Sequence, residues 1–221
     1  IQYIIYSQEH KNRIILKGDI MNILPNTSYE NEDFSSEDFT EVQIQGCEFT
    51  NCNFKLSNIS EANITNSRFN SCNFNLADMK NILCENSAFT NCNFENTTLF
   101  LSTFKECKLT GSNFAGSNTT GLNIIQGDWS YVNLRGASFK NHILENTNFE
   151  RADLSESSFE GAKLKNVNLS YANLNRCNFK NADLRETNLA YTPIKNMIFS
   201  NTKVNLETSV MIAEAYGAIC S

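Results

Sequence analysis

The sequence lacks the features that would point to a membrane protein, a metalloprotein or a common class of enzyme. No stretch of its 221 residues approaches the roughly 18 to 20 consecutive apolar residues of a membrane-spanning helix. The two histidines, His10 and His142, lie far apart, and no two cysteines have the CxxC spacing of a zinc site. Phosphate-binding glycine loops and the GxSxG and HExxH motifs are also missing. We therefore expect no membrane span, no metal, no cofactor and no enzymatic activity.

Basic residues are scarce as well. The chain has 18 lysines and arginines against 24 aspartates and glutamates, which gives a formal net charge of −6. Direct binding to DNA, RNA or anionic lipid normally requires a surplus of positive charge. We therefore expect neither nucleic acid nor membrane as a direct ligand, and a basic partner fits better. The N-terminal IQYIIY is too short for the apolar core of a signal peptide, which favours a cytoplasmic protein.

Large apolar residues recur every five positions. Stepping by five from Phe34 to Val204 gives 35 units without an insertion or deletion, and only Cys84 and Thr119 fall short of a large side chain. We call this large residue the centre of each unit. The residue two before it is almost always small, and the residue one before it is usually polar, dominated by Asn and Asp. A helix repeats its apolar face every 3.6 residues and a half-buried strand every 2, so neither explains this period.

A period of five is satisfied when each unit forms one short straight side and then turns a corner. Four sides close a coil of 20 residues, in which Asn and Asp side chains can bond their own backbone at the corners. Residues 20 apart then stack in columns about 4.8 Å apart. The columns are apolar throughout: one contains Phe34, Phe54, Phe74, Phe94, Phe114, Leu134, Leu154, Leu174 and Ile194, and another contains Phe49, Phe69, Phe89, Leu109, Trp129, Phe149, Leu169 and Leu189.

The segments RADLS, YANLN and NADLR match the consensus A(D/N)LXX, so the chain resembles the pentapeptide-repeat family. That resemblance implies an all-β solenoid, a right-handed quadrilateral β-helix, here of about nine coils with a short C-terminal α-helix. We divide the chain into an N-terminal cap over 1–28, the repeat β-helix over 29–205 and a C-terminal dimerisation helix over 206–221.

Eight cysteines raise the question of metal binding or disulfides. Six of them (Cys47, Cys52, Cys72, Cys92, Cys107 and Cys177) occupy the small position, Cys84 is a centre and Cys220 lies in the tail. Buried free cysteines behave as small hydrophobes. We favour that interpretation over a zinc site or a functional disulfide, although the sequence leaves the oxidation state open.

Acidic residues are concentrated near the start of the repeat. Between residues 30 and 61, Lys55 is the one base among eight acids: Glu30, Glu32, Asp33, Glu37, Asp38, Glu41, Glu48 and Glu61. They form either a solvated surface that protects the first coils from pairing with other chains, or a docking surface for a basic groove.

The repeat ends in an apolar segment with helical character. A helix is expected from about Glu207 to Tyr216, with Thr208 or Ser209 as N-cap and Gly217 as a stop signal. The segment is apolar on nearly every side, so one face can cover the solenoid and the rest needs a second surface. Either it is a lone cap, or it forms a homodimer interface through Val210, Met211, Ile212, Ala213, Ala215 and Tyr216.

The uninterrupted repeat, the segment GDWSYVNL and the terminal MIAEAYGAI resemble the quinolone-resistance (Qnr) and mycobacterial fluoroquinolone-resistance branch of the family. That branch implies a dimeric, DNA-mimicking protein that binds DNA gyrase and topoisomerase IV and protects them from fluoroquinolones. Two subunits of about nine coils each, joined tail to tail, would measure about 80 to 90 Å, the length of roughly 25 base pairs of DNA. The alternative is a protein-interaction scaffold or immunity factor with another partner.

Overall fold

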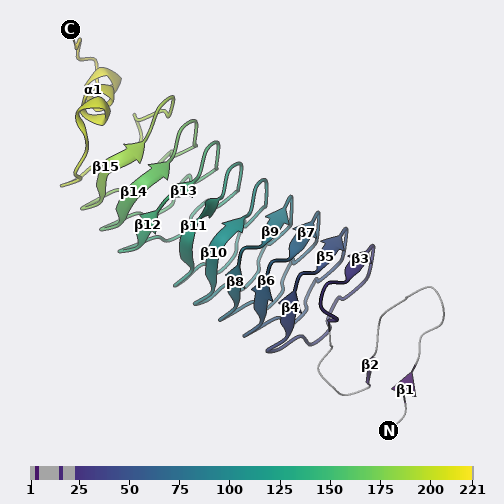
Figure 1. Cartoon of the computed structure of the whole chain (residues 1–221). Coiled ribbons are helices and arrows are strands. Elements are labelled where there is room, and N and C mark those ends of the chain that lie inside the picture. Colours follow the sequence, from purple (N-terminus) through teal and green to yellow (C-terminus); the bar gives the residue numbers. More distant parts are fainter. Residues whose placement is uncertain (1–2, 5–14, 17–22, 221) are drawn as a thin grey trace.

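The computed structural model describes residues 3–4, 15–16 and 23–220, and the expected N-terminal cap over 1–28 falls largely outside them. The described chain is a β-solenoid of about eight turns followed by one short helix (Figure 1), which confirms the expected fold class. β1 (Tyr3–Ile4) and β2 (Ile15–Leu16) form a separate antiparallel pair. The number of turns is close to the nine expected from the repeat length.

Two of the four sides of each coil carry the strands. The first side holds β4 (Gln43–Gln45), β6 (Asn63–Thr65), β8 (Leu83–Glu85) and β12 (Ile143–Glu145), and the second holds β3 (Ser28–Glu30), β5 (Glu48–Thr50), β7 (Arg68–Asn70), β9 (Ala88–Thr90) and β13 (Thr147–Asn148). Four longer strands span both sides: β10 (Thr103–Lys108), β11 (Asn123–Asp128), β14 (Lys163–Asn168) and β15 (Asp183–Asn188).

Strands in neighbouring coils pair in parallel with a shift of 20 residues, as in Ser28 opposite Glu48 and Gln43 opposite Asn63. The other two sides keep the same register through single bridges, such as Asp33 to Asn53 and Asp38 to Asn58. Between β14 and β15 the register slips by one residue. A constant shift of 20 confirms that four five-residue sides make one coil.

Each corner is made by a residue with positive φ, two positions after the centre. Asn51 has φ of 52° and Leu56 has φ of 60°, and the same conformation recurs every five residues along most of the solenoid. Asn and Gly adopt this left-handed conformation more readily than other residues, and they occupy many of the corners. The corners are therefore set by backbone geometry that the apolar period does not reveal.

The core consists of the predicted columns. The rings of Phe34, Phe54, Phe74 and Phe94 stack with centroids 4.9 Å apart, and all are almost fully buried. A second column continues upstream of its predicted start, because Tyr29 stacks on Phe49 at 4.9 Å. The interior is filled by side chains, as in any closely packed core.

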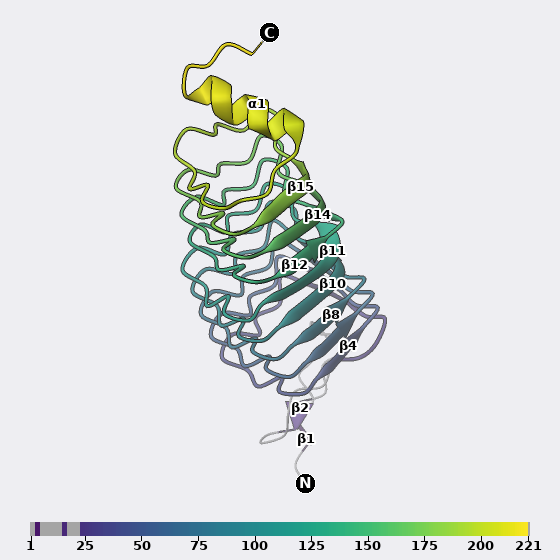
Figure 2. The same cartoon turned by 90° about the vertical axis from the view of Figure 1, so that its left-hand side faces the viewer.

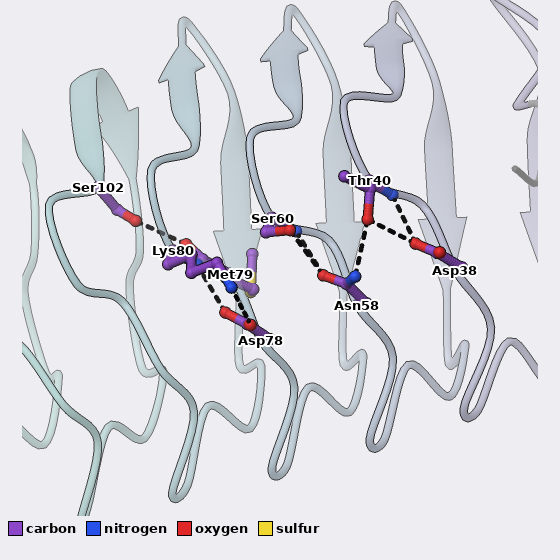
Figure 3. Close-up of polar contacts among 8 residues, drawn as sticks. All are labelled: Asp38, Thr40, Asn58, Ser60, Asp78, Met79, Lys80 and Ser102. Carbon is purple, nitrogen blue, oxygen red and sulfur yellow. Dashed lines mark hydrogen bonds and ion pairs between the residues drawn. The ribbon is translucent and has the colours of Figure 1, made fainter.

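The small position also carries hydrogen bonds. Ser102 Oγ donates to the carbonyl oxygen of Met79 at 2.6 Å (Figure 3), and Cys177 Sγ lies 2.8 Å from the carbonyl oxygen of Leu154. Each pair joins residues 23 apart, so the small side chain links its own coil to the preceding one. This bond explains why Ser, Thr and Cys occur there as well as Ala.

Polar side chains form ladders on the outside of the coils. In Figure 3, Asp38 Oδ1 accepts from the backbone N–H of Thr40 at 3.0 Å, and Asn58 Oδ1 accepts from the N–H of Ser60 at 3.1 Å. Asn58 Nδ2 also donates to Thr40 Oγ1 in the preceding coil at 2.7 Å. The expectation that Asn and Asp before each centre bond their own backbone is confirmed.

The helix α1 (Leu206–Ala215) lies across the end of the solenoid (Figure 2). Its N-cap is Asn205, whose Oδ1 accepts from the backbone N–H of Thr208 at 2.8 Å. The expected cap at Thr208 or Ser209 is therefore wrong, because Thr208 is already inside the helix and buried. Asn is as good an N-cap as Ser or Thr. Gly217 follows the helix with φ of 92°, in agreement with the expected stop.

Candidate interaction surfaces

Hollows on the described surface are shallow and lie between neighbouring coils. One of about 430 Å³ is lined by Arg68, Ala88 and Lys108 among others, and another of about 300 Å³ includes Lys163 and Glu186. Within the described residues, no three His, Cys, Asp or Glu side chains gather as metal ligands. The same part of the chain contains no helix that is long and apolar enough to cross a membrane. The candidate functional residues lie on the outer surface.

The cysteines belong to the interior rather than to a reactive site. All eight are free thiols, and Cys220 is the exposed one. Burial raises the pKa of the Cys177 thiol to about 12, so this thiol stays protonated at neutral pH. Cys84 and Cys107 bring their sulfur atoms to 3.5 Å without a disulfide, and burial raises the pKa of Cys84. These observations agree with the expected role as small buried residues.

The eight predicted acidic residues surround the first coils instead of forming one patch. Glu30 and Glu48 lie on the side of β3 and β5, in strands that pair with each other. Asp33 and Asp38 lie on the two sides that carry only bridges. Glu41 and Glu61 are corner residues one coil apart, with φ of 59° and 62°. The remaining two, Glu32 and Glu37, occupy small positions on those bridge sides.

Some of these carboxylates accept hydrogen bonds from other residues of the solenoid. Asp33 Oδ1 accepts from Asn53 Nδ2 at 3.0 Å in the next coil. The hydroxyl and backbone N–H of Thr40 bond to Asp38 and lower the pKa of its carboxyl group. A hydrogen bond to the charged form stabilises it. Asp33 and Asp38 are thus held in place by the coil, and the lowered pKa keeps the carboxyl group of Asp38 charged.

Charge is distributed unequally along the solenoid axis. Residues 23–128, which we call the acidic half, contain thirteen acids and five bases. Residues 129–205, which we call the basic half, contain ten bases and seven acids. The bases of the second half are Arg135, Lys140, Arg151, Lys163, Lys165, Arg176, Lys180, Arg185, Lys195 and Lys203. The two halves of one continuous fold therefore carry net charges of opposite sign.

The predicted dimer residues divide between the two faces of α1. Met211, Ile212 and Ala215 pack against the core at the end of the solenoid. Val210 and Ala213 are half-buried, and Tyr216 is 66% exposed. Leu206, which the sequence analysis did not include, is 81% exposed. The face of α1 available to a second copy is therefore formed by Leu206, Val210 and Ala213. Tyr216, the C-cap, is exposed beside it and donates its hydroxyl to the carbonyl oxygen of Lys195 at 3.2 Å.

One further surface was missed from the sequence. Tyr131, Arg151, Tyr171 and Tyr191 occupy successive positions of one corner in the basic half, and Tyr171 stacks on Tyr191 at 4.6 Å. We call these four residues the Tyr–Arg strip. They are spaced by 20, so following the outward columns as well as the inward ones would have found them.

These features define a protein of the pentapeptide-repeat type, a solenoid whose interior is filled by side chains. A family model described as the pentapeptide repeat region matches residues 22–99 and 132–208, and the chain therefore belongs to the pentapeptide-repeat family. A comparison with curated proteins yields no significant match.

Solved structures support the same fold. The chain is similar to full-length QnrB1, a plasmid-mediated fluoroquinolone resistance protein, with a TM-score of 0.69 and 19% identity over 87% of this chain and 98% of QnrB1. A trypsin-treated variant of QnrB1 gives a TM-score of 0.70 and 18% identity over 88% of this chain and 99% of that one. At this level of identity the similarity establishes the fold alone.

Proposed function

We propose that this protein is a non-catalytic, DNA-mimicking partner of type II topoisomerases that protects DNA gyrase or topoisomerase IV from fluoroquinolones. The observation that carries the proposal is the correspondence with QnrB1, which extends over nearly the whole of that fluoroquinolone resistance protein. The interior is filled by stacked rings such as Phe54 and Phe74, so the outer surface is left to make the contacts. A cytoplasmic location is part of the same proposal.

The acidic half is the part that would meet the enzyme. Its carboxylates lie at corners and sides of coils that repeat about every 4.8 Å, a distance comparable in scale to the spacing of phosphates along DNA. A basic surface that normally binds DNA would attract these carboxylates at low salt. Glu41 and Glu61 are exposed corner residues that lie one above the other in neighbouring coils.

Homodimerisation through α1 is the second part of the proposal. Leu206 exposes a large apolar surface at the start of α1, and Tyr216, the C-cap, is 66% exposed while its hydroxyl donates to the carbonyl oxygen of Lys195 at 3.2 Å. Light scattering should give twice the 25.0 kDa mass of the chain. Leu206→Asp with Tyr216→Asp should give the single-chain mass and leave the solenoid folded. An unchanged mass in the double variant would contradict this interface.

The enzymatic test measures cleavage of DNA by purified gyrase trapped with a fluoroquinolone. Added protein should reduce the amount of linear DNA, and Glu41→Gln with Glu61→Gln should weaken this effect. Glu145→Gln, on β12 in the basic half, is the matched control and should not. Full cleavage in the presence of the wild-type protein, together with no binding at low salt, would refute the proposal.

The charge distribution favours a second candidate, a protein-interaction scaffold or immunity factor. The basic half adjoins α1, so a tail-to-tail dimer would place a surplus of positive charge at its centre. A DNA mimic would be expected to continue its negative charge through that region. Binding of gyrase with no change in drug-induced cleavage would support a scaffold over a protecting protein.

A further inference from the structure

The hollow of about 430 Å³ lies over Ala88, on the outer face of the second strand side. The strands β7, β9 and β10 lie in successive coils there (Figure 1). Ala88 of β9 is opposite Arg68 of β7 in the preceding coil and opposite Lys108 of β10 in the following one. Both bases are exposed and two coil steps apart, about 9.6 Å, whereas Ala88 is half-buried. The short side chain of Ala88 therefore leaves a notch with a base on either side.

Both bases lack an acidic partner among the described residues. In the same half of the solenoid, Lys105 pairs with Glu85 of the neighbouring coil at 3.1 Å. Neither Arg68 nor Lys108 forms an ion pair of this kind within the described part of the chain, although acids outnumber bases there. Their positive charges are therefore available to a ligand in the hollow.

Two asparagines supply further hydrogen-bond donors. Asn66 and Asn86 line the hollow from the adjoining corner, in neighbouring coils, with φ of 51° and 49°. Further along the same corner, Asn166 Nδ2 donates to Asn146 Oδ1 at 2.7 Å. The side-chain amides of Asn66 and Asn86 form no such bond with each other or with any other described residue. Their N–H groups can therefore donate to a ligand without breaking a ladder.

One acceptor completes the lining. Glu106 occupies the same corner one coil beyond Asn86, and its carboxylate has no ion pair within the described residues. The hydroxyl groups of Ser67 and Ser87, which also line the hollow, are buried and donate to backbone carbonyl oxygens of their own coils. The charged groups that line the hollow are thus two bases and one acid, a net positive charge.

The next acids in the column lie outside the hollow. Glu48 and Asp128 continue the column beyond the two bases, on the sides away from Ala88. The carboxylate of Asp128 already accepts from Thr110 Oγ1 at 3.2 Å and from Asn148 Nδ2 at 3.0 Å. Exposed charges at a distance are screened by salt, so the groups in contact with a ligand determine its identity.

We propose that this hollow binds hydrogen phosphate. The guanidinium of Arg68 and the ammonium of Lys108 donate to phosphate oxygens from opposite sides, at the usual charge-assisted distance of about 2.8 Å. The amides of Asn66 and Asn86 donate to a further oxygen. The carboxylate of Glu106 accepts from the P–OH group.

This arrangement of donors and one acceptor separates hydrogen phosphate from other common anions. Sulfate carries no proton at neutral pH, so the carboxylate of Glu106 repels it and receives no hydrogen bond. A carboxylate ligand has two oxygens, which is few for donors on four side chains, and chloride has a single centre. The site does not depend on the proposed topoisomerase function, because it is formed by one chain alone.

The test follows amide NMR signals of the full chain during titration with sodium phosphate, with sodium chloride keeping the ionic strength constant. Phosphate should cause saturable shifts of the side-chain amide signals of Asn66 and Asn86 and of the backbone signal of Ala88. Arg68→Gln should weaken the affinity about tenfold, since it removes a charge-assisted hydrogen bond. Lys55→Gln, which replaces an exposed base on a bridge side of the same half, is the matched control and should bind normally.

Two further variants test the shape of the hollow and its acceptor. Ala88→Gln fills the notch with an uncharged side chain and should abolish phosphate binding although both bases remain. Glu106→Gln should allow sulfate to bind as well, because the repelling charge is lost. Gln43 already occupies an outward strand position, so we expect both variants to fold. A thermal unfolding curve of each variant separates loss of binding from loss of structure.

Four results would overturn the proposal. They are equal affinity of the wild-type protein for phosphate and sulfate, unchanged phosphate affinity in Arg68→Gln, unchanged phosphate affinity in Ala88→Gln, and shifts that grow linearly without saturation. The last result would mean an adventitious ion only.

Discussion

The acidic and basic halves of the solenoid share one backbone but differ inside and outside. In the column that starts at Phe34, the acidic half stacks phenylalanines and the basic half stacks Leu134, Leu154 and Leu174. The small position beneath that column holds Cys52, Cys72 and Cys92 in the first half and Ala152 and Ala172 in the second. The coil geometry therefore accepts different packing solutions as long as the volume of each layer is filled.

Outside, the difference between the halves is chemical. The acidic half surrounds its first coils with carboxylates, whereas the basic half presents the Tyr–Arg strip and a surplus of bases. Side chains that point away from the core contribute little to folding, so each half can carry a different surface. Four sets of measurements test how independent the two halves are.

The largest effect is expected in the aromatic column of the acidic half. Phe74→Ala should reduce the free energy of unfolding by about 3–5 kcal/mol, because it leaves a cavity between Phe54 and Phe94. Leu154→Ala in the same column should cost less, about 2–3 kcal/mol, because a smaller side chain without ring stacking is lost. Denaturant unfolding measures both. A larger loss of unfolding free energy for Leu154→Ala than for Phe74→Ala would contradict this prediction and show that the column is more important for stability in the basic half.

The next effect lies where the halves meet. Gly127 has φ of 120°, and a Cβ there would overlap the carbonyl oxygen of Cys107. Gly127→Ala should therefore destabilise the solenoid by about 1–3 kcal/mol through backbone strain. Gly136→Asn is the matched control. The φ of 72° at this position suits Asn, and a Cβ added there would meet no atom within 4 Å. Equal melting temperatures for the two variants would contradict this account.

Overpacking of the small position tests the basic half. Ala172→Leu should reduce stability by about 1–3 kcal/mol, because the buried layer has no space for three more carbon atoms. Ala172→Cys should be almost neutral, since Cys72 occupies the equivalent position in the acidic half. If Ala172→Cys were as destabilising as Ala172→Leu, the two halves would not share one packing rule.

The smallest effect concerns two carboxylates held in different ways. In the basic half, a hydrogen bond from Arg185 lowers the pKa of Asp183 to about 2. The stability that this pair contributes is present above the usual Asp pKa of about 3.9 and is lost as the pH falls towards about 2. In the acidic half, the pKa of Asp38 is lowered by uncharged Thr40 instead.

NMR titration of the two carboxyl groups at low and high salt distinguishes these cases. The pKa of Asp183 should rise in salt and in Arg185→Gln, because a charged partner is screened. The pKa of Asp38 should change little with salt. Equal salt responses would mean that Arg185 does not determine the ionisation of Asp183.

The sequence predicted the core well because the period of five leaves few alternatives. Centres spaced by five residues, such as Phe74, can all point inward only if four five-residue sides close each coil. This requirement determined the predicted columns and the register of 20 residues. The helix at the end was also predicted, since its apolar run begins where the repeat stops.

Other features could not be derived from the apolar period. The left-handed corners depend on backbone sterics, and residues as different as Asn51, Leu56 and Tyr131 adopt them. The N-cap Asn205 resembles the many other asparagines of the repeat, so it gave no distinct signal. Which face of α1 packs inward depends on how the helix lies on the end of the solenoid. The spacing of apolar residues within the helix does not contain that information.

The most direct test of the central claim, that the acidic half docks on a type II topoisomerase, is hydrogen exchange of the full chain with and without DNA gyrase. Binding should slow amide exchange in residues 28–61, where the eight acids surround the first coils, and leave the corner at Tyr171 unchanged. Unaltered exchange in residues 28–61 at saturating enzyme would contradict the account.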